Sequence, residues 1–177
     1  MSADTFTTAI FLITAVIAAS VLVSAIFPVV YQMSGTFTSA SHTADQQMRT
    51  NMQIVLNVAY YYGNPPPSNS PNIERVWMKN TGNRQIPVAE INQADVFCGD
   101  VGNFKRMNGP TSGPYTNNDV WAITPYFSNP NSWSPGETLE VDCYPSTITG
   151  TTDPVYFQFV LPNGISASDQ FTVSTTP

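Results

Sequence analysis

The sequence predicts an α+β protein in which a long N-terminal hydrophobic α-helix, a transmembrane segment or stalk, precedes an antiparallel immunoglobulin-like β-sandwich. Residues 5–31 form an apolar run without a charged side chain, and from residue 73 short apolar segments alternate with turn signals. A Pro-rich stretch separates the two parts. The predicted organisation is a transmembrane anchor helix at 1–35, a helical stalk at 36–63, a Pro-rich hinge at 64–72 and an extracytoplasmic β-sandwich domain at 73–177.

The apolar run is long enough to cross a membrane. A hydrocarbon core about 30 Å thick needs roughly 20 apolar residues in a helix that rises about 1.5 Å per residue. Ala9–Tyr31 supplies 23 residues. The residues before it, Met1–Asp4, lack the Lys or Arg of a secretory signal, and the run exceeds the roughly 7–15 apolar residues of such a signal. We therefore expect an uncleaved anchor.

The large side chains of this run are the candidates for membrane contact or helix association. A helix that is apolar on every side needs either lipid or other helices around it. The sequence leaves both environments open. The candidate residues are Ile10, Phe11, Ile13, Val16, Ile17, Val21, Leu22, Val23 and Ile26.

Helical spacing continues beyond the anchor. Between Gln32 and Tyr62 apolar residues recur at intervals of three, four and seven, which predicts a helical stalk. Pro28 and Gly35 are expected to bend or weaken the helix, because proline removes a backbone hydrogen bond. The prolines that follow Gly63 are expected to end it.

The sequence of the second half of the chain predicts short strands. Its apolar residues alternate with polar ones, and Gly, Pro and Asn separate the segments, which is typical of an antiparallel sandwich. The predicted strands lie at 75–80, 86–91, 95–99, 120–126, 138–144, 155–161 and 170–174. The expected core residues are Trp77, Phe97, Trp121, Leu139, Val141, Phe157 and Phe159.

Composition excludes several functions. The net charge is −6, and every Lys and Arg lies between residues 49 and 106, so no basic stripe for nucleic acid is expected. The single histidine, His42, lies in the stalk, outside the predicted sandwich, so a Ser-His-Asp catalytic triad is not expected. Cys98 and Cys143 are expected to form a disulfide outside the cell or to remain two buried thiols.

No cofactor or metal motif is present. Asp95, Asp100, Asp119 and Glu137 could offer oxygen ligands, but their spacing matches no calcium loop such as the EF-hand. Phosphate-binding and nucleophile-elbow motifs are also missing. The sequence therefore predicts a protein that is not an enzyme and has no cofactor or metal.

Several short motifs follow the order found in a known family. The chain resembles the FlaG family of archaellum accessory proteins, within the archaellin and type IV pilin-like superfamily. The matching motifs, which span nearly the whole chain, are TAIFLI at 8–13, SAIFP at 24–28, TSASH at 38–42, VWMKNTG at 76–82, DVFCGDVGNFKR at 95–106, WSPGETL at 133–139 and LPNG at 161–164.

This resemblance implies a role as well as a fold. A FlaG-like protein is expected in the cytoplasmic membrane of an archaeon, with its sandwich outside, acting as a stator-like scaffold with the partner FlaF and S-layer protein. Flagellins and pilins share the helix-plus-sandwich plan but carry a basic residue and Gly before the apolar run, a pattern missing from residues 1–8. The alternatives are a filament-forming archaellin or pilin-like subunit, whose N-terminal helices pack together in a homo-oligomer, and a cell-surface binding module.

Overall fold

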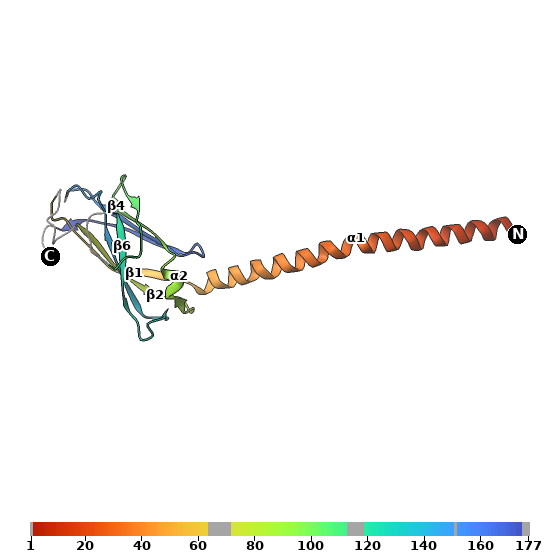
Figure 1. Ribbon diagram of the computed structural model, residues 1–177, viewed down its shortest axis with the longest axis horizontal. Helices are drawn as coiled ribbons and strands as arrows, with labels where there is room; N and C mark the ends of the chain where they lie inside the picture. Colours follow the sequence, from red (N-terminus) through yellow and green to blue (C-terminus); the bar gives the residue numbers. More distant parts are fainter. Residues whose placement is uncertain (1, 64–71, 113–118, 151, 175–177) are drawn as a thin grey trace. The chain divides into compact units, whose positions relative to one another are not determined.

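The computed structural model describes residues 2–63, 72–112, 119–150 and 152–174. It divides into two compact units, Met1–Ala44 and Asp45–Pro177 (Figure 1). The predicted Pro-rich hinge at 64–72 lies outside the described residues, except for Asn72. Each unit is described separately below.

The first unit consists of helix. The helix α1 covers Ser2–Arg49 and contains Pro28. The expected interruptions at Pro28 and Gly35 do not end it, because the assigned helix runs through both residues. A proline inside a helix removes one hydrogen bond, and the remaining bonds on either side maintain the helix.

The predicted helical stalk is wrong beyond residue 49. The chain leaves α1 at Arg49 and forms the strand β1, Met52–Tyr60, so the sandwich begins about 20 residues before the predicted boundary at residue 73. β1 pairs with β2, Ile73–Asn80, from Met52 opposite Asn80 to Tyr60 opposite Ile73. Apolar residues at helical spacing also suit a strand when several are β-branched, and the pairing with β2 decides between the two.

The second unit confirms the predicted antiparallel β-sandwich. Its larger sheet has the order β11-β1-β2-β8-β6 and its smaller sheet the order β10-β9-β4-β5, while β3 and β7 pair separately. All pairs are antiparallel except β1 with β11. The remaining elements are β3 (Ile86–Pro87), α2 (Val88–Ile91), β4 (Asp95–Asp100), β5 (Lys105–Arg106), β6 (Val120–Tyr126), β7 (Ser132–Trp133), β8 (Thr138–Tyr144), β9 (Val155–Val160), β10 (Ser166–Phe171) and β11 (Val173–Ser174).

The core lies between the two sheets. Five of the predicted core residues are buried there: Trp121, Leu139, Val141, Phe157 and Phe159. The ring of Trp121 meets that of Phe159 edge to face, with 6.1 Å between ring centroids, an arrangement that aromatic pairs favour.

Two core predictions are wrong. Trp77 and Phe97 are only half-buried, because the inward positions of their strands belong to Val76 and Met78 in β2 and to Val96 and Cys98 in β4. Side chains alternate between the two faces of a strand, so a one-residue difference moves a side chain to the other face.

A disulfide connects the two sheets. In the structure Cys98 of β4 is bonded to Cys143 of β8, with 6.5 Å between their Cα atoms, and both side chains are buried. The bond closes a loop across a sequence separation of 45 residues. A cross-link of this span restricts the unfolded chain and so favours the folded sandwich.

We predict that the double variant Cys98→Ala, Cys143→Ala lowers the free energy of unfolding by about 2–5 kcal/mol. The measurement is urea unfolding of the full chain in detergent. A reductant should shift the wild-type midpoint in the same direction and leave that of the double variant unchanged. Equal midpoints for the oxidised wild type and the variant would contradict the prediction.

Candidate functional site

The surface of α1 is apolar and uncovered. Every described side chain from residue 3 to residue 44 is exposed. The nine residues predicted for membrane contact or helix association are between 49% and 72% exposed. Successive helical residues point about 100° apart, so these nine surround the helix axis instead of forming one stripe. Within the described residues this is the one helix long and apolar enough to cross a membrane.

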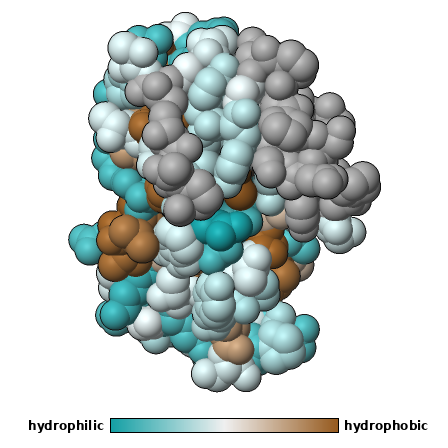
Figure 2. All heavy atoms as spheres, turned by 90° about the vertical axis from the view of Figure 1, so that its left-hand side faces the viewer, coloured by the Kyte–Doolittle hydropathy of each residue, from teal (hydrophilic) through white to brown (hydrophobic). Residues whose placement is uncertain are grey.

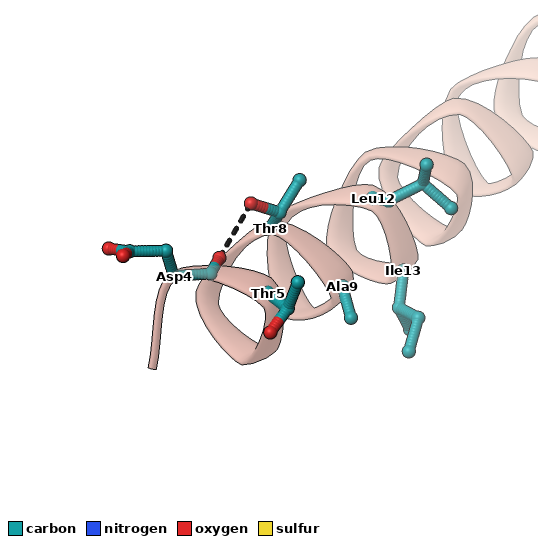
Figure 3. Close-up of a pocket in the computed structure, with 6 residues that line it drawn as sticks. All are labelled: Asp4, Thr5, Thr8, Ala9, Leu12 and Ile13. Atoms are coloured by element: carbon teal, nitrogen blue, oxygen red, sulfur yellow. Dashed lines mark hydrogen bonds between the residues drawn. The ribbon is translucent and has the colours of Figure 1, made fainter. Parts of the chain in front are cut away.

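Threonine side chains of this segment donate hydrogen bonds inside the helix. The Thr8 hydroxyl donates a hydrogen bond to the Asp4 carbonyl at 2.7 Å, while Leu12 and Ile13 point outward (Figure 3). The Thr14 hydroxyl donates in the same way to the Ile10 carbonyl at 2.8 Å. Threonine hydroxyls bonded to the preceding turn need no water, so they can enter an apolar environment at low cost.

The last turn of α1 belongs to the second unit and is capped by a distant turn. The Arg49 carbonyl accepts hydrogen bonds from the N–H groups of Asn83 at 2.9 Å and Arg84 at 3.3 Å. The Asn51 carbonyl accepts from Thr81 at 3.0 Å and from Gly82 at 2.9 Å. The final carbonyls of a helix lack partners within it, and here the β2–β3 turn supplies partners for the carbonyl of Arg49, the last residue of α1.

Gly82 allows this close approach. A Cβ atom at this position would collide with the Arg49 carbonyl oxygen and lie 2.6 Å from the Asn51 nitrogen. Both neighbours are backbone atoms, which cannot move aside as a flexible side chain would. Glycine is therefore required where the turn meets the end of the helix.

The β9–β10 turn contacts the same end of α1. The Gln47 side-chain amide donates to the Asn163 carbonyl at 2.8 Å, and the Asn163 side-chain amide donates to the Thr50 hydroxyl at 3.1 Å. The Thr50 hydroxyl in turn donates to the Gln46 carbonyl at 2.6 Å. We call residues 46–51 together with residues 81–84 and Asn163 the helix joint.

A buried network supports the joint. The Asn80 side-chain amide donates to the Trp133 carbonyl at 3.0 Å and the Arg84 carbonyl at 2.9 Å, and its oxygen accepts from the Gly82 N–H at 3.0 Å. The Glu137 backbone carbonyl accepts from the Trp133 indole at 2.8 Å and from the Asn80 N–H at 3.1 Å. The joint is thus attached to β2 of the larger sheet and to Trp133 of the β3–β7 pair.

The Glu137 carboxylate organises two loops. It accepts hydrogen bonds from the N–H groups of Ser128 and Ser134, both at 2.8 Å. These two bonds lower the pKa of Glu137, because they stabilise its charged form. From the sequence, Glu137 was only a candidate oxygen ligand for a metal and a member of the WSPGETL motif. Its hydrogen-bond partners become apparent only in the fold.

The outer face of the larger sheet carries a second exposed apolar feature. A β-bulge between Ile54 and Leu56 leaves Val55 and Leu56 60% and 59% exposed. Leu56 lies opposite Trp77, whose ring has the Arg75 guanidinium 5.9 Å from its centroid. Arg75 also makes two hydrogen bonds to Asp142, at 2.7 and 2.9 Å. On the face of the molecule in Figure 2, by contrast, hydrophobic residues form small separate patches among polar ones.

Among the described residues, the remaining sequence candidates have separate surroundings. His42 is exposed on α1. Asp95 pairs with Arg106 at 2.7 Å and Asp119 with Lys105 at 3.2 Å, so these carboxylates lie in separate ion pairs. Within the described parts of the chain, no group of three or more His, Cys, Asp or Glu side chains is placed to hold a metal ion.

Sequence reasoning missed the helix joint. The sequence shows a turn signal at 80–83 and the LPNG motif at 161–164, but their hydrogen-bond partners lie far away along the chain and meet them only in the fold. The need for glycine at position 82 could not be predicted from the sequence either, because the backbone atoms that crowd Gly82 belong to another segment of the chain.

A family model described as archaeal-type flagellin matches residues 2–171. An uncharacterized protein of Archaeoglobus fulgidus is 23% identical over 183 residues, which cover 97% of this chain and 99% of the relative.

Solved structures share the fold. The archaeal flagellum of Methanospirillum hungatei is 12% identical in sequence, and the superposition has a TM-score of 0.63. The matched region covers 96% of this chain and 93% of the flagellum chain. The archaellum periplasmic stator protein FlaG from Sulfolobus acidocaldarius is 21% identical, with 69% and 99% coverage and a TM-score of 0.50. Archaeal flagellin FlaB1 from Methanocaldococcus jannaschii is 12% identical, with 72% and 92% coverage and a TM-score of 0.52.

We predict that Gly82→Ala lowers the free energy of unfolding by about 1–3 kcal/mol, because its methyl group collides with backbone at the joint. Urea unfolding of the full chain measures this loss. Hydrogen exchange at Asn83 and Arg84 should quicken as well. The matched control is Gly150→Ala, where a Cβ would meet no atom within 4 Å. Equal losses for both variants would contradict the role given to Gly82.

We predict a pH-dependent effect of Glu137→Gln. A carboxyl group whose pKa is lowered by folding stabilises the fold above its unfolded pKa and loses this effect as the pH falls through its folded pKa. The thermal midpoint of the variant should therefore be below that of the wild type at pH 7, and the two should converge in acid below about pH 4. A difference that is constant with pH would show that the charge of Glu137 is not the cause.

Proposed function

Since this chain belongs to the archaeal-type flagellin family, we propose that it is a non-enzymatic structural component of the archaellum, anchored in the membrane by α1 and acting as a stator-like scaffold of the FlaG kind. The observation that carries the proposal is the length of the apolar part of the exposed helix. Ala9–Tyr31 spans about 35 Å at about 1.5 Å per residue, which matches a hydrocarbon core of about 30 Å.

The polarity of α1 changes where the helix would leave the membrane. From Gln32 to Ala44 most side chains are Gln, Ser, Thr or His, with Met33 and Phe37 among them, and all are exposed. The first charged residue after Asp4 is Asp45. A helix that is apolar for one bilayer thickness and polar thereafter suits a single anchor whose second half stands in water.

The sandwich suits a location outside the cell. Disulfides persist in oxidising environments, and the Cys98–Cys143 pair links the two sheets of the second unit. With the sandwich outside, the four residues before Thr5 would lie on the cytoplasmic side.

The proposed partners follow from the resemblance to FlaG. They are FlaF and S-layer protein, which would give the sandwich a fixed attachment outside the membrane. The likeness to the Sulfolobus FlaG structure covers 69% of this chain and supports a shared fold. Such a contact needs no catalysis, because it resists force by remaining bound.

A filament subunit is the second candidate. The likeness to the Methanospirillum flagellum extends over 96% of this chain, and therefore includes most of α1. In this case the exposed apolar side chains would be buried against α1 helices of other copies. A contact that does not close on itself would extend into a filament.

Val16→Asp tests the anchor. A carboxylate at the centre of a spanning helix costs about 2.5–3.5 kcal/mol, so we predict that the variant shifts from the membrane fraction toward the soluble or aggregated fraction. The matched control is Ser39→Asp, which places the same charge in the polar part of α1 and should remain in the membrane. Equal membrane retention of both variants would contradict anchoring by residues 9–31.

Electron microscopy separates the two candidates. The full chain is purified in detergent, the detergent is removed, and the sample is compared with protein reconstituted into liposomes. Discrete liposome-bound particles would support the scaffold. Regular filaments formed by the wild-type protein but not by the Val16→Asp variant would contradict the scaffold and support the filament subunit.

A further inference from the structure

One acidic side chain lies in the core of the sandwich without a partner. The side chains of β2 alternate between its two faces, and Glu74 occupies an inward position in line with Val76 and Met78. Glu74 is completely buried, and neither of its carboxylate oxygens has a hydrogen-bond partner. A buried, unpaired carboxylate is strongly unfavourable in its charged form, and such a group takes up a proton instead.

No Lys or Arg among the described residues neutralises Glu74. Arg75, the next residue along β2, points to the opposite face of the strand and pairs with Glu140 and Asp142. Lys79 is exposed further along the same strand. The other four cations form ion pairs elsewhere: Arg49 with Asp45, Arg84 with Glu90, Lys105 with Asp119 and Arg106 with Asp95.

The groups around Glu74 come from both sheets. Its neighbours in the larger sheet are Ala59 of β1 and Cys143 of β8, and neither titrates, because Cys143 is in the disulfide. From the smaller sheet, β4 contributes Asp100, which is 7% exposed and whose Oδ2 accepts from the Thr149 N–H at 3.1 Å and hydroxyl at 2.9 Å. Within the described residues, Asp100 is the charged group from these elements that acts on Glu74.

The electrostatics of this region favour a neutral Glu74. Burial raises the pKa of Glu74 well above its usual range, and the nearby Asp100 carboxylate raises it further. The Gly99 N–H opposes this rise, but it makes no hydrogen bond of ordinary geometry to the Glu74 carboxylate. A second negative charge beside Asp100 would be repelled strongly, since the interior screens charges much less than water does.

We propose that Glu74 is a proton-binding site inside the sandwich, and that release of this proton in less acidic surroundings loosens β2 against β4. Glu74 lies opposite Cys143, and Cys143 is bonded to Cys98, two residues before Asp100 on β4. A charged Glu74 needs water, and water reaches it only if the two strands separate locally. The proton therefore closes the sandwich beside the disulfide that joins its two sheets.

The sign of the pH effect follows from proton linkage. A group whose pKa is raised by folding gives the folded state an advantage that is complete below its unfolded pKa, about 4.3 for Glu. This advantage is lost as the pH rises through the folded pKa. Over that interval one proton is released on unfolding, so the unfolding equilibrium constant grows by up to about tenfold per pH unit. Glu137 has the opposite sign, because its pKa is lowered.

This proton site makes the sandwich respond to its surroundings. The proposed function places the sandwich outside the cell, where it would meet the pH of the external medium. The site itself does not depend on that location or on the anchor, because Glu74 and Asp100 both belong to the second unit. A test on the purified protein can therefore fail without affecting the proposed function.

The test compares the wild-type full chain with Glu74→Gln, both in detergent, by urea unfolding from about pH 4 to about pH 8. Gln is close in size to the neutral acid but does not titrate. The wild type should lose stability relative to the variant as the pH rises, by up to about tenfold in the unfolding equilibrium constant per pH unit. The matched control is Asp153→Asn, an exposed carboxylate, which should follow the wild type at every pH.

Infrared spectroscopy keeps the test decisive if Glu74→Gln fails to fold. At about pH 6 exposed carboxyl groups are ionised, so the wild type should show the band of a protonated carboxyl group, which weakens as the pH rises. Where the variant folds, this band should be missing, and at about pH 8 hydrogen exchange in β2 and β4 should be slower than in the wild type.

Three results would overturn the proposal. The first is a stability difference between the wild type and Glu74→Gln that does not vary with pH. The second is the absence of a protonated carboxyl band from the wild type at about pH 6. The third is equal hydrogen exchange of the two proteins in β2 and β4 at about pH 8, which would show that proton release does not loosen these strands.

Discussion

A helix that is apolar on all sides cannot remain isolated in water, and the rest of this protein depends on that constraint. The nine large side chains of α1 point in every direction, so no single face of a sandwich could cover them. Each would release about 1.5–3 kcal/mol on burial. Lipid and a bundle of identical helices both meet this need.

The sandwich holds the end of this helix by hydrogen bonds to backbone groups. The Arg49 and Asn51 carbonyls are satisfied by the β2–β3 turn, and Asn163 reaches the same point from the β9–β10 turn. Because these partners come from both the larger and the smaller sheet, a force on the last helical turn reaches both layers. The attachment of the last helical turn is therefore spread over several groups and does not depend on one side chain.

The two sheets of the sandwich are held together by contacts in the core. Trp121 packs against Phe159 across the interior, and Cys98 is joined to Cys143. The buried Glu74 and Asp100 lie in this same region, beside the disulfide.

The sequence by itself determined the uncharged apolar helix, the change to alternating strands and the turn residues, because each of these depends on neighbours within a few positions. It misassigned residues 52–60, since their apolar spacing suits a helix as well as a strand and only pairing with β2 decides. The sequence also predicted Trp77 and Phe97 in the core, where the structure has them half-buried. The alternation of side chains does not say which face of a strand points inward, because the packing of the opposite sheet decides this. The helix joint and the Glu74–Asp100 pair required the tertiary structure, because their atoms come from segments that only folding brings together.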